Sequence, residues 1–180
     1  MYLISIYFDE AAEKRISSYM RQIGKTTGNT VMLDGNVPPH ITISAFQATS
    51  DSIAREIFLQ GVKNVKEGSV QWVSVGLFLS GVIYLAAILN QYLQELTETF
   101  YRETTKIQGV IVNHKYMPYS WLPHSTLAKQ LSEEQMATAV EIMQRRFGPF
   151  CGKVTRIGLS KTNPYTNLEI IDLDKKSDIR

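Results

Sequence analysis

The chain has few of the features that identify the larger function classes. Its 180 residues contain a single cysteine, Cys151, which excludes an internal disulfide and a zinc site built from cysteines. Lys and Arg total 19 against 17 for Asp and Glu, and the two signs are mixed along the chain. This balance does not favour a protein that coats duplex nucleic acid through many phosphate contacts. It is compatible with a small phosphorylated ligand in a locally basic cleft.

A long hydrophobic segment is also missing. The uncharged, mostly apolar stretch 74–89 is shorter than the roughly 20 residues that span a bilayer as a helix. Ser80-Gly81 divides it into two strand-like halves, so we predict two buried strands joined at a tight turn and no membrane association. The apolar run 1–8 is too short for a signal peptide and lacks a basic leader, which favours a cytoplasmic protein. Without a heptad pattern, a monomer is the default expectation.

An apolar content of 44% and a charged content of 20% are those of an ordinary globular protein. We expect a single domain over 1–180 that contains two pseudo-repeats, about 1–80 and 81–180. Each half follows the order strand, helix, strand, helix, strand. The pattern predicts an α+β fold of two pseudo-equivalent lobes, with two antiparallel sheets flanked by helices and a central cleft.

The predicted elements of the first half are strands over 2–8, 41–46 and 73–77, a helix over about 10–23, and a helix after Ser50 that buries Ile53, Ile57 and Phe58. Those of the second half are strands over 82–86, from 124, 154–159 and 168–173, and helices over about 89–103 and 133–147, the latter burying Met136, Val140 and Met143. Ser132 and Gln135 are spaced as a capping box. Asn163-Pro164-Tyr165 is expected to form the last turn, and 172–180 a solvated tail. Long connections, 24–39 and 107–123, precede both predicted central strands and are candidates for functional loops.

Two matched triplets carry the chemistry of the sequence. His40-Ile41-Thr42 and His124-Ser125-Thr126 each follow a proline, at equivalent points of the repeat. Because residues two apart in a strand share a face, each histidine projects together with its threonine. If the lobes are related by a pseudo-two-fold axis, two imidazoles and two hydroxyls converge on one cleft.

These groups suit phosphodiester cleavage. One histidine can deprotonate the attacking water while the other protonates the leaving oxygen, because an imidazole pKa near 6.5 permits both states. Hydroxyl donors can stabilise the charge on the nonbridging oxygens, and no metal is required. A single histidine at a strand start is usually structural, but the coincidence of two favours function. His114 lacks this context and is interpreted as a loop histidine.

With these motifs, His40-Ile41-Thr42-Ile43 and His124-Ser125-Thr126-Leu127, the chain resembles the two-histidine phosphoesterase superfamily, and within it the branch named for 2′-5′ RNA ligases. The resemblance implies a bilobal fold with the site between the lobes and no metal or other cofactor. It also implies action on a small nucleotide or RNA end with a 2′,5′- or cyclic phosphate. His40 and His124 would be catalytic, and Thr42 and Thr126 would bind the substrate.

Two further positions are candidates for substrate binding. Lys129 stands where many members of this family carry a basic residue, often arginine; it either contacts phosphate or is a solvated strand end. Tyr119, like its neighbours Tyr116 and Trp121, either stacks on a base or packs the loop, and packing is favoured for Trp121.

The preferred hypothesis is therefore a metal-independent phosphodiesterase acting on a 2′,3′-cyclic or 2′-5′ phosphodiester. Pseudo-symmetry leaves open which histidine is acid and which is base. The alternatives are a 2′-5′ RNA ligase, which uses the same groups in reverse, and a nucleotide- or RNA-binding module with little turnover. A metal site at the two histidines is disfavoured because no carboxylate cluster accompanies either triplet.

Overall fold

The computed structural model describes residues 1–162 and 165–174. Its strands are β1 (Tyr2–Phe8), β2 (Ile41–Gln47), β3 (Gly68–Phe78), β4 (Val82–Ala87), β5 (Ile111–Val112), β6 (His124–Ala128), β7 (Phe150–Lys161) and β8 (Thr166–Asp172). Its helices are α1 (Glu10–Thr27), α2 (Val31–Asp34), α3 (Asp51–Val62), α4 (Gln91–Thr105), α5 (Glu133–Arg146) and a 3-10 turn, η1 (His114–Tyr116). The strand and helix order of both predicted repeats is thus present, and α2, β5 and η1 lie within the two long connections.

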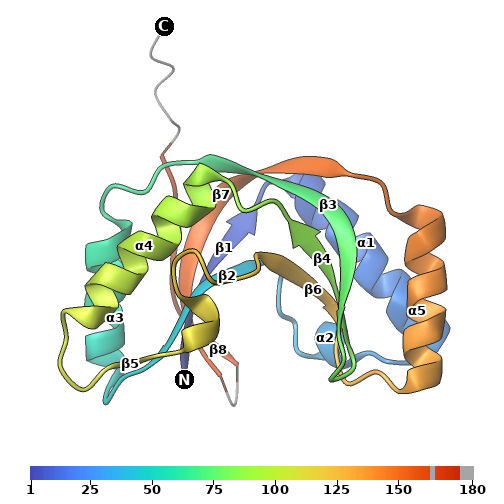
Figure 1. The fold of residues 1–180 in the computed structure, drawn as a ribbon, viewed down its shortest axis with the longest axis horizontal. Coiled ribbons are helices and arrows are strands. Elements are labelled where there is room, and N and C mark those ends of the chain that lie inside the picture. Colours follow the sequence, from blue (N-terminus) through green and yellow to red (C-terminus); the bar gives the residue numbers. More distant parts are fainter. Residues whose placement is uncertain (163–164, 175–180) are drawn as a thin grey trace, which may run out of the picture.

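The strands form an antiparallel sheet with the order β5-β2-β1-β7-β3-β4-β6, and β8 pairs with β7 outside this path. The α+β class and antiparallel pairing are as predicted. The two expected sheets are, however, continuous. Residues 68–72 of β3 pair with 150–154 of β7, and the far ends of these long strands continue into opposite lobes. The sheet curves so that β2 and β6 approach each other at the centre (Figure 1).

Each lobe contains one helix that comes from the other repeat. α1, from the first repeat, packs with α5 and against β6, whereas α4, from the second repeat, packs with α3 and against β2. Figure 1 shows the two helix pairs on opposite sides of the molecule. Each lobe is consequently built from both halves of the sequence.

Local chemistry fixes the helix ends. The side chains of Asp9, Ser50 and Asn90 each accept a hydrogen bond from the backbone N–H three residues on, which begins α1, α3 and α4. The predicted capping box of Ser132 and Gln135 is present at the start of α5.

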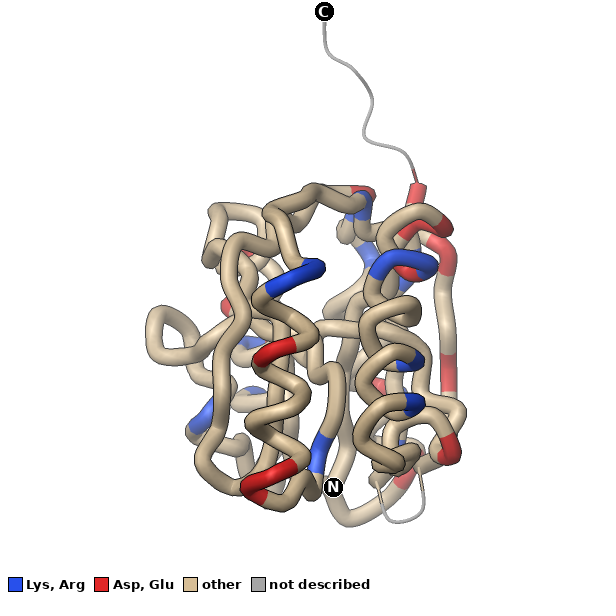
Figure 2. Tube along the Cα trace, turned by 90° about the vertical axis from the view of Figure 1, so that its right-hand side faces the viewer, with Lys and Arg blue, Asp and Glu red and all other residues tan. Residues whose placement is uncertain are grey.

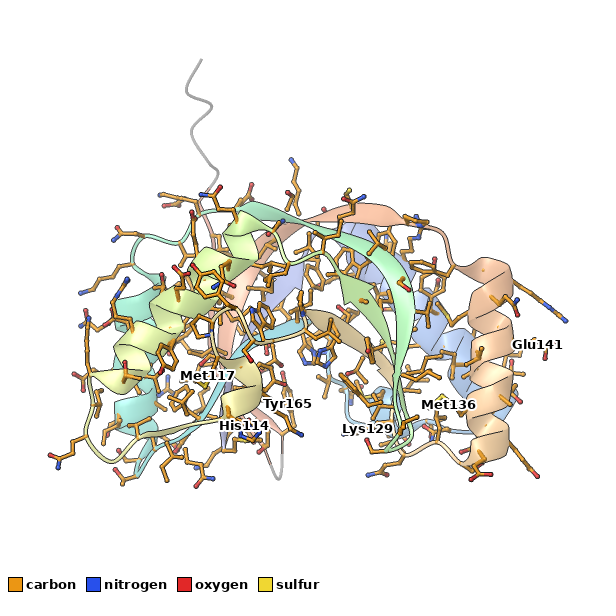
Figure 3. All side chains as sticks on the ribbon, in the orientation of Figure 1. His114, Met117, Lys129, Met136, Glu141 and Tyr165 are labelled. Atoms are coloured by element: carbon orange, nitrogen blue, oxygen red, sulfur yellow. The ribbon has the colours of Figure 1, made fainter. Side chains whose placement is uncertain are left out.

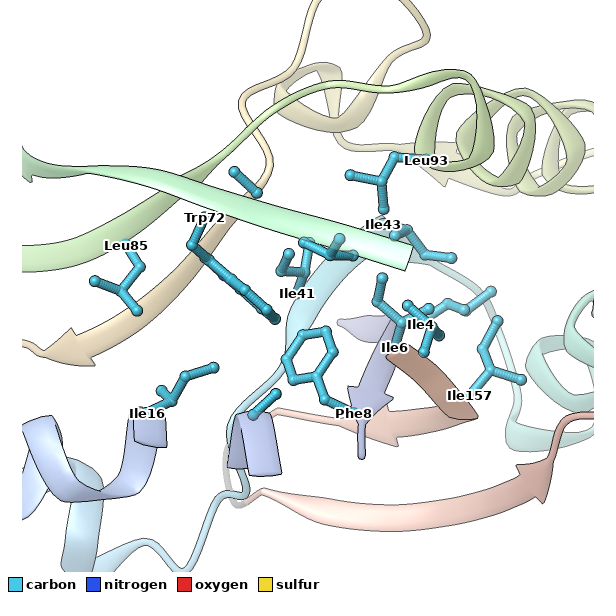
Figure 4. Close-up of a cluster of buried hydrophobic side chains, with 14 of the residues drawn as sticks. Ile4, Ile6, Phe8, Ile16, Ile41, Ile43, Trp72, Leu85, Leu93 and Ile157 are labelled. Carbon is cyan, nitrogen blue, oxygen red and sulfur yellow. The ribbon is translucent and has the colours of Figure 1, made fainter. Parts of the chain in front are cut away.

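One core runs through both lobes. Trp72 is fully buried at its centre, edge-on to Phe8 and stacked on Phe150, each with ring centroids 4.7 Å apart. Figure 4 shows aliphatic side chains of α1 and several strands meeting around it, among them Ile16 and Ile41. This aromatic contact joins the lobes, since Phe8, Trp72 and Phe150 come from three different strands.

The predicted hairpin between 74 and 89 is confirmed. Gly81 lies in the turn with a φ of 82°, and an added Cβ would lie 2.7 Å from the carbonyl oxygen of Leu131, so this position requires glycine. The prediction that both strands are buried is wrong for β3, where the side chain of Leu77 is 41% exposed and Val73 36%. In the part of the chain that the structure describes, no helix is both long and apolar enough to cross a membrane.

Two other details differ from the sequence prediction. Val140 of α5 is 38% exposed, because Ala139 and Met143 supply the buried face of this helix. Asp172 belongs to β8 and Leu173 is buried, so the ordered chain continues past the predicted start of the tail. Residues 163–164 of the predicted turn and 175–180 of the predicted tail lie outside the described residues.

Candidate active site

The two histidine motifs lie on the two strands that meet at the centre of the molecule. His40 immediately precedes β2 and His124 begins β6. Although the two residues are far apart in the sequence, the positive form of His124 lowers the pKa of His40. The contact between β2 and β6 therefore brings the two imidazoles near each other.

The two imidazoles are held in the same way. Nδ1 of His40 lies 2.8 Å from the carbonyl oxygen of Pro38, and Nδ1 of His124 lies 2.8 Å from that of Leu122. A carbonyl oxygen only accepts, so in both rings Nδ1 must carry the proton. Each neutral ring consequently has its lone pair on Nε2, and neither Nε2 is hydrogen-bonded within the described chain. Two equivalent nitrogens are left to exchange protons.

Burial also changes the protonation equilibrium of both imidazoles. Desolvation lowers the pKa of His40 and of His124 from the usual value of 6.5, and the carbonyl contacts oppose this only in part. The positive charge of Lys129 lowers the pKa of His40 further. In the unliganded protein, both imidazoles are thus biased towards the neutral form.

Aromatic side chains fix the ring of His124. The rings of Phe78 and Tyr84 contact it edge-on, with centroids 5.1 Å and 5.2 Å away. Tyr7 lies farther from His40, at 6.3 Å. Rings packed in this way restrict rotation of the imidazole and hold its Nε2 in one direction.

The threonines occupy equivalent places with different surroundings. Thr42 is buried, with its Oγ1 3.3 Å from the hydroxyl oxygen of Ser5. Burial raises the pKa of the Tyr116 phenol, and the nearby hydroxyl of Thr42 acts in the opposite direction. Thr126 is half-buried, and no hydrogen bond to its hydroxyl is formed within the described residues.

The residue between His124 and Thr126 points the other way, as strand alternation requires. Ser125 is fully buried and accepts a hydrogen bond of 3.2 Å from the indole nitrogen of Trp72. The triplet thus has one side chain in the core and two on the opposite face of β6.

A cavity of about 570 Å³ opens beside His124. It is lined by Phe78 and Ser80 of the β3–β4 hairpin, and by His114, Lys115, Tyr116, Ser120, Trp121 and Leu122 of the connection that precedes β6. No acidic residue is among these lining residues. Its size falls within the range of about 300–1,000 Å³ that is typical of small-molecule sites.

The two remaining predicted site residues differ in position. Lys129 follows β6, near enough to His40 to affect its pKa, and Figure 3 shows it across the opening between the lobes from His114. Tyr119 does not line the cavity. It is 79% exposed, and its backbone N–H donates a hydrogen bond of 3.3 Å to the side chain of Gln94 in α4. The nearby carboxylate of Glu98 raises the pKa of Tyr119, and the phenol lowers that of Glu98.

Among the residues that line the cavity, sequence reasoning missed His114, Lys115 and Phe78. His114, interpreted from the sequence as a loop histidine, is the first residue of the 3-10 turn η1 in the connection that precedes β6. The pair His114-Lys115, next to Tyr116 in a long connection, was the feature of the sequence that could have indicated a binding site. Nothing in the sequence near Phe78 indicated that its ring contacts His124.

Charge elsewhere on the surface is mixed. Figure 2 shows both basic and acidic residues on each of the two helices nearest the viewer. Within residues 1–162 and 165–174, no three His, Cys, Asp or Glu side chains gather as a group that could hold a metal ion.

The model of the 2′-5′ RNA ligase superfamily matches residues 9–165 of the chain. The chain belongs to this superfamily. The resemblance drawn from the paired motifs is thereby confirmed, and membership supports a phosphodiester-processing activity.

Solved structures agree with this 2′-5′ RNA ligase-like assignment. Escherichia coli LigT complexed with 3′-AMP is 15% identical, with a TM-score of 0.61 over 97% of this chain and 98% of that chain. The complex of LigT with NADP⁺ is 17% identical, with a TM-score of 0.62 and 97% of each chain covered. A protein of Thermus thermophilus is 15% identical, with a TM-score of 0.59 over 97% of this chain and 98% of its own. At these identities the likeness concerns the fold. A search of the curated proteins finds no sequence match.

Proposed function

We propose that the protein is a metal-independent phosphodiesterase that hydrolyses a 2′,3′-cyclic or 2′-5′ nucleotide or RNA phosphodiester. His40 and His124 act as the general acid and base, and Thr42, Thr126 and Lys129 bind the phosphate. The observation that carries the proposal is the matched tethering of the two imidazoles, each by Nδ1 to a carbonyl oxygen two residues earlier.

The reaction follows from the protonation states. Nε2 of one neutral imidazole takes a proton from water, and the water oxygen forms a bond to phosphorus. The bond from phosphorus to a ribose oxygen breaks, and the other imidazole, protonated on Nε2, delivers its proton to that oxygen. Hydroxyl groups of the two threonines donate to the nonbridging oxygens as negative charge develops on them.

The negative charge of the substrate favours protonation of the histidine that acts as the acid. Both imidazoles have a lowered pKa in the unliganded protein, so the acid requires a partner that favours its charged form. A bound phosphodiester carries a negative charge, and an opposite charge within a few ångströms raises the pKa of an imidazole. Binding of substrate thus promotes protonation of one ring.

Two alternatives use the same site. Ligation at a 2′-5′ linkage is the reverse reaction and needs the same acid and base. A nucleotide- or RNA-binding module needs the hydroxyl and cationic groups but not proton transfer. LigT has been crystallised with 3′-AMP, ATP and NADP⁺, which supports a small nucleotide as a ligand here.

The test is hydrolysis of 2′,3′-cyclic nucleotides and of a 2′-5′-linked dinucleotide in the presence of chelator. His40→Ala and His124→Ala are each expected to lower kcat by about 10²–10⁴-fold, the usual contribution of a general acid or base. Product chromatography identifies the ribose oxygen that leaves.

Binding of 3′-AMP to the same variants separates the alternatives. Retained affinity with lost turnover supports acid–base catalysis. Wild-type binding of nucleotide without turnover of any substrate favours the binding module, whereas joining of the dinucleotide's products favours the ligase. Activity that requires added metal contradicts the proposal.

A further inference from the structure

The cavity beside His124 is lined mostly by residues outside the two histidine motifs. Part of its lining is η1, whose His114 and Lys115 contribute an imidazole and an ammonium group. Neither residue belongs to the histidine motifs, and neither is needed to move a proton between water and the leaving oxygen. The cavity therefore offers polar groups that could bind a part of the ligand away from the reacting phosphate.

The indole of Trp121 is part of the lining of the same cavity. Its side chain lines the cavity and is only 8% exposed, yet Nε1 finds no hydrogen-bond acceptor among the described residues. Buried donors are nearly always paired in folded proteins. The adjacent Ser120 supplies a further hydroxyl to the lining. Because Nε1 is itself covered by the surrounding protein, Trp121 offers the cavity its ring surface and not its N–H.

The residues that line the cavity favour a negatively charged ligand. No carboxylate faces the cavity among its lining residues, and His114 and Lys115 stand with no acidic partner there. Lys129 lies outside this lining, on the other side of the site from His114 (Figure 3), where its positive charge acts on His40. Phosphate oxygens accept strong, charge-assisted hydrogen bonds from such groups.

The lining also has an apolar part. Phe78, Tyr116 and Trp121 contribute aromatic surface to a lining that includes both His124 and η1. Base stacking on such side chains is a general feature of single-strand recognition. A volume of about 570 Å³ accommodates a nucleoside between the two ends.

We propose that this cavity binds a nucleotide that carries a second phosphate, one nucleoside away from the reacting phosphate, and that His114 and Lys115 contact this second phosphate. The inference rests on the proposed reaction at His40 and His124, and it narrows the substrate class. An oligonucleotide end, or a nucleotide phosphorylated at two ribose positions, is preferred over a simple cyclic mononucleotide.

Calorimetric binding of adenosine 3′-monophosphate and adenosine 3′,5′-bisphosphate tests the second site directly, because the ligands differ in one phosphate. The wild-type protein is expected to bind the bisphosphate about tenfold more tightly, as for a charge-assisted contact. In the double variant His114→Gln/Lys115→Gln this ratio should fall below about twofold. Lys153→Gln, which removes one positive charge from an exposed position on β7, is the matched control and should keep the wild-type ratio.

A ratio near one in the wild type, or one that persists in the double variant, overturns the proposal. Hydrolysis provides a second comparison, between adenosine 2′,3′-cyclic phosphate and its 5′-phosphorylated form, and the same preference should appear in kcat/KM. Turnover without preference contradicts only the second site. Preferential binding without turnover supports the second site and contradicts the proposed hydrolysis, so the two failures are distinguishable.

Discussion

Replacement of Ser125 by alanine separates the structural from the chemical part of the second histidine motif. Ser125 stands between His124 and Thr126, but its hydroxyl accepts a hydrogen bond from Trp72 in the core. Both side chains are fully buried, and the donor–acceptor distance is 3.2 Å. Ser125→Ala removes the acceptor and leaves the indole N–H buried without a partner.

An unsatisfied buried donor costs about 1–3 kcal/mol of folding free energy. For a domain of this size, each 1 kcal/mol lowers Tm by about 2–4 °C, so the expected decrease is about 2–12 °C. Hydrolysis by the folded variant should change little, because the lost oxygen lies on the opposite face of β6 from His124.

The adjacent substitution Thr126→Val is the matched control, since it also removes one hydroxyl from β6. Valine keeps the shape of threonine, and the hydroxyl of Thr126 has no hydrogen bond within the described residues, so Tm should change by less than about 2 °C. If this hydroxyl stabilises the phosphate in the transition state, kcat/KM should fall by about 10²–10³-fold, as for an oxyanion-hole donor.

Thermal unfolding followed by circular dichroism and hydrolysis of a 2′,3′-cyclic nucleotide measure the two effects on the same protein samples. The reasoning predicts reciprocal results: lower Tm with retained activity for Ser125→Ala, and retained Tm with lower activity for Thr126→Val. A Ser125→Ala protein with unchanged Tm and lost activity would refute the assigned direction of the side chains.

Two further outcomes are expected. In steady-state kinetics across pH, kcat/KM should be bell-shaped with its maximum below pH 6.5, because burial lowers the pKa of both His40 and His124 and one ring must be protonated while the other is neutral. The maximum of kcat should lie at higher pH, since bound phosphate raises the imidazole pKa; a rate that only rises with pH contradicts this. In thermal unfolding, Gly61→Ala should destabilise the α3–α4 contact by about 1–3 kcal/mol, because the new Cβ would lie 2.3 Å from the buried ring of Phe100. Phe100→Leu in the same protein should recover part of the loss, and a stabilised Gly61→Ala protein would show that the ring moves away without cost.

Much of the local structure could be predicted from the sequence. Strand alternation placed Ser125 on one face and its two neighbours on the other, and the spacing of Ser132 and Gln135 predicted the start of α5. These features depend on interactions within a few residues, so local sequence is sufficient. The histidine motifs were found for the same reason, since each is a short segment in a recognisable strand.

Periodicity was less reliable where a helix or strand is only partly covered. Val140 has the spacing of a buried residue in α5 but remains exposed. The outer half of β3 is likewise apolar and uncovered. Hydrophobic spacing indicates which residues can be buried, but the position of the neighbouring element decides which of them are.

The sequence by itself determined the order of the elements, the two histidine motifs and the family. Only the tertiary structure decided that α1 and α4 exchange lobes, that both imidazoles are tethered through Nδ1, and that η1 faces His124. It also placed Tyr119 beside α4, through its backbone bond to Gln94, and outside the lining of the cavity. The physical reason is that these contacts join segments far apart in the chain. Their geometry depends on how the whole sheet curves and on how the helices pack against it. Neither of these can be predicted from patterns within a few residues.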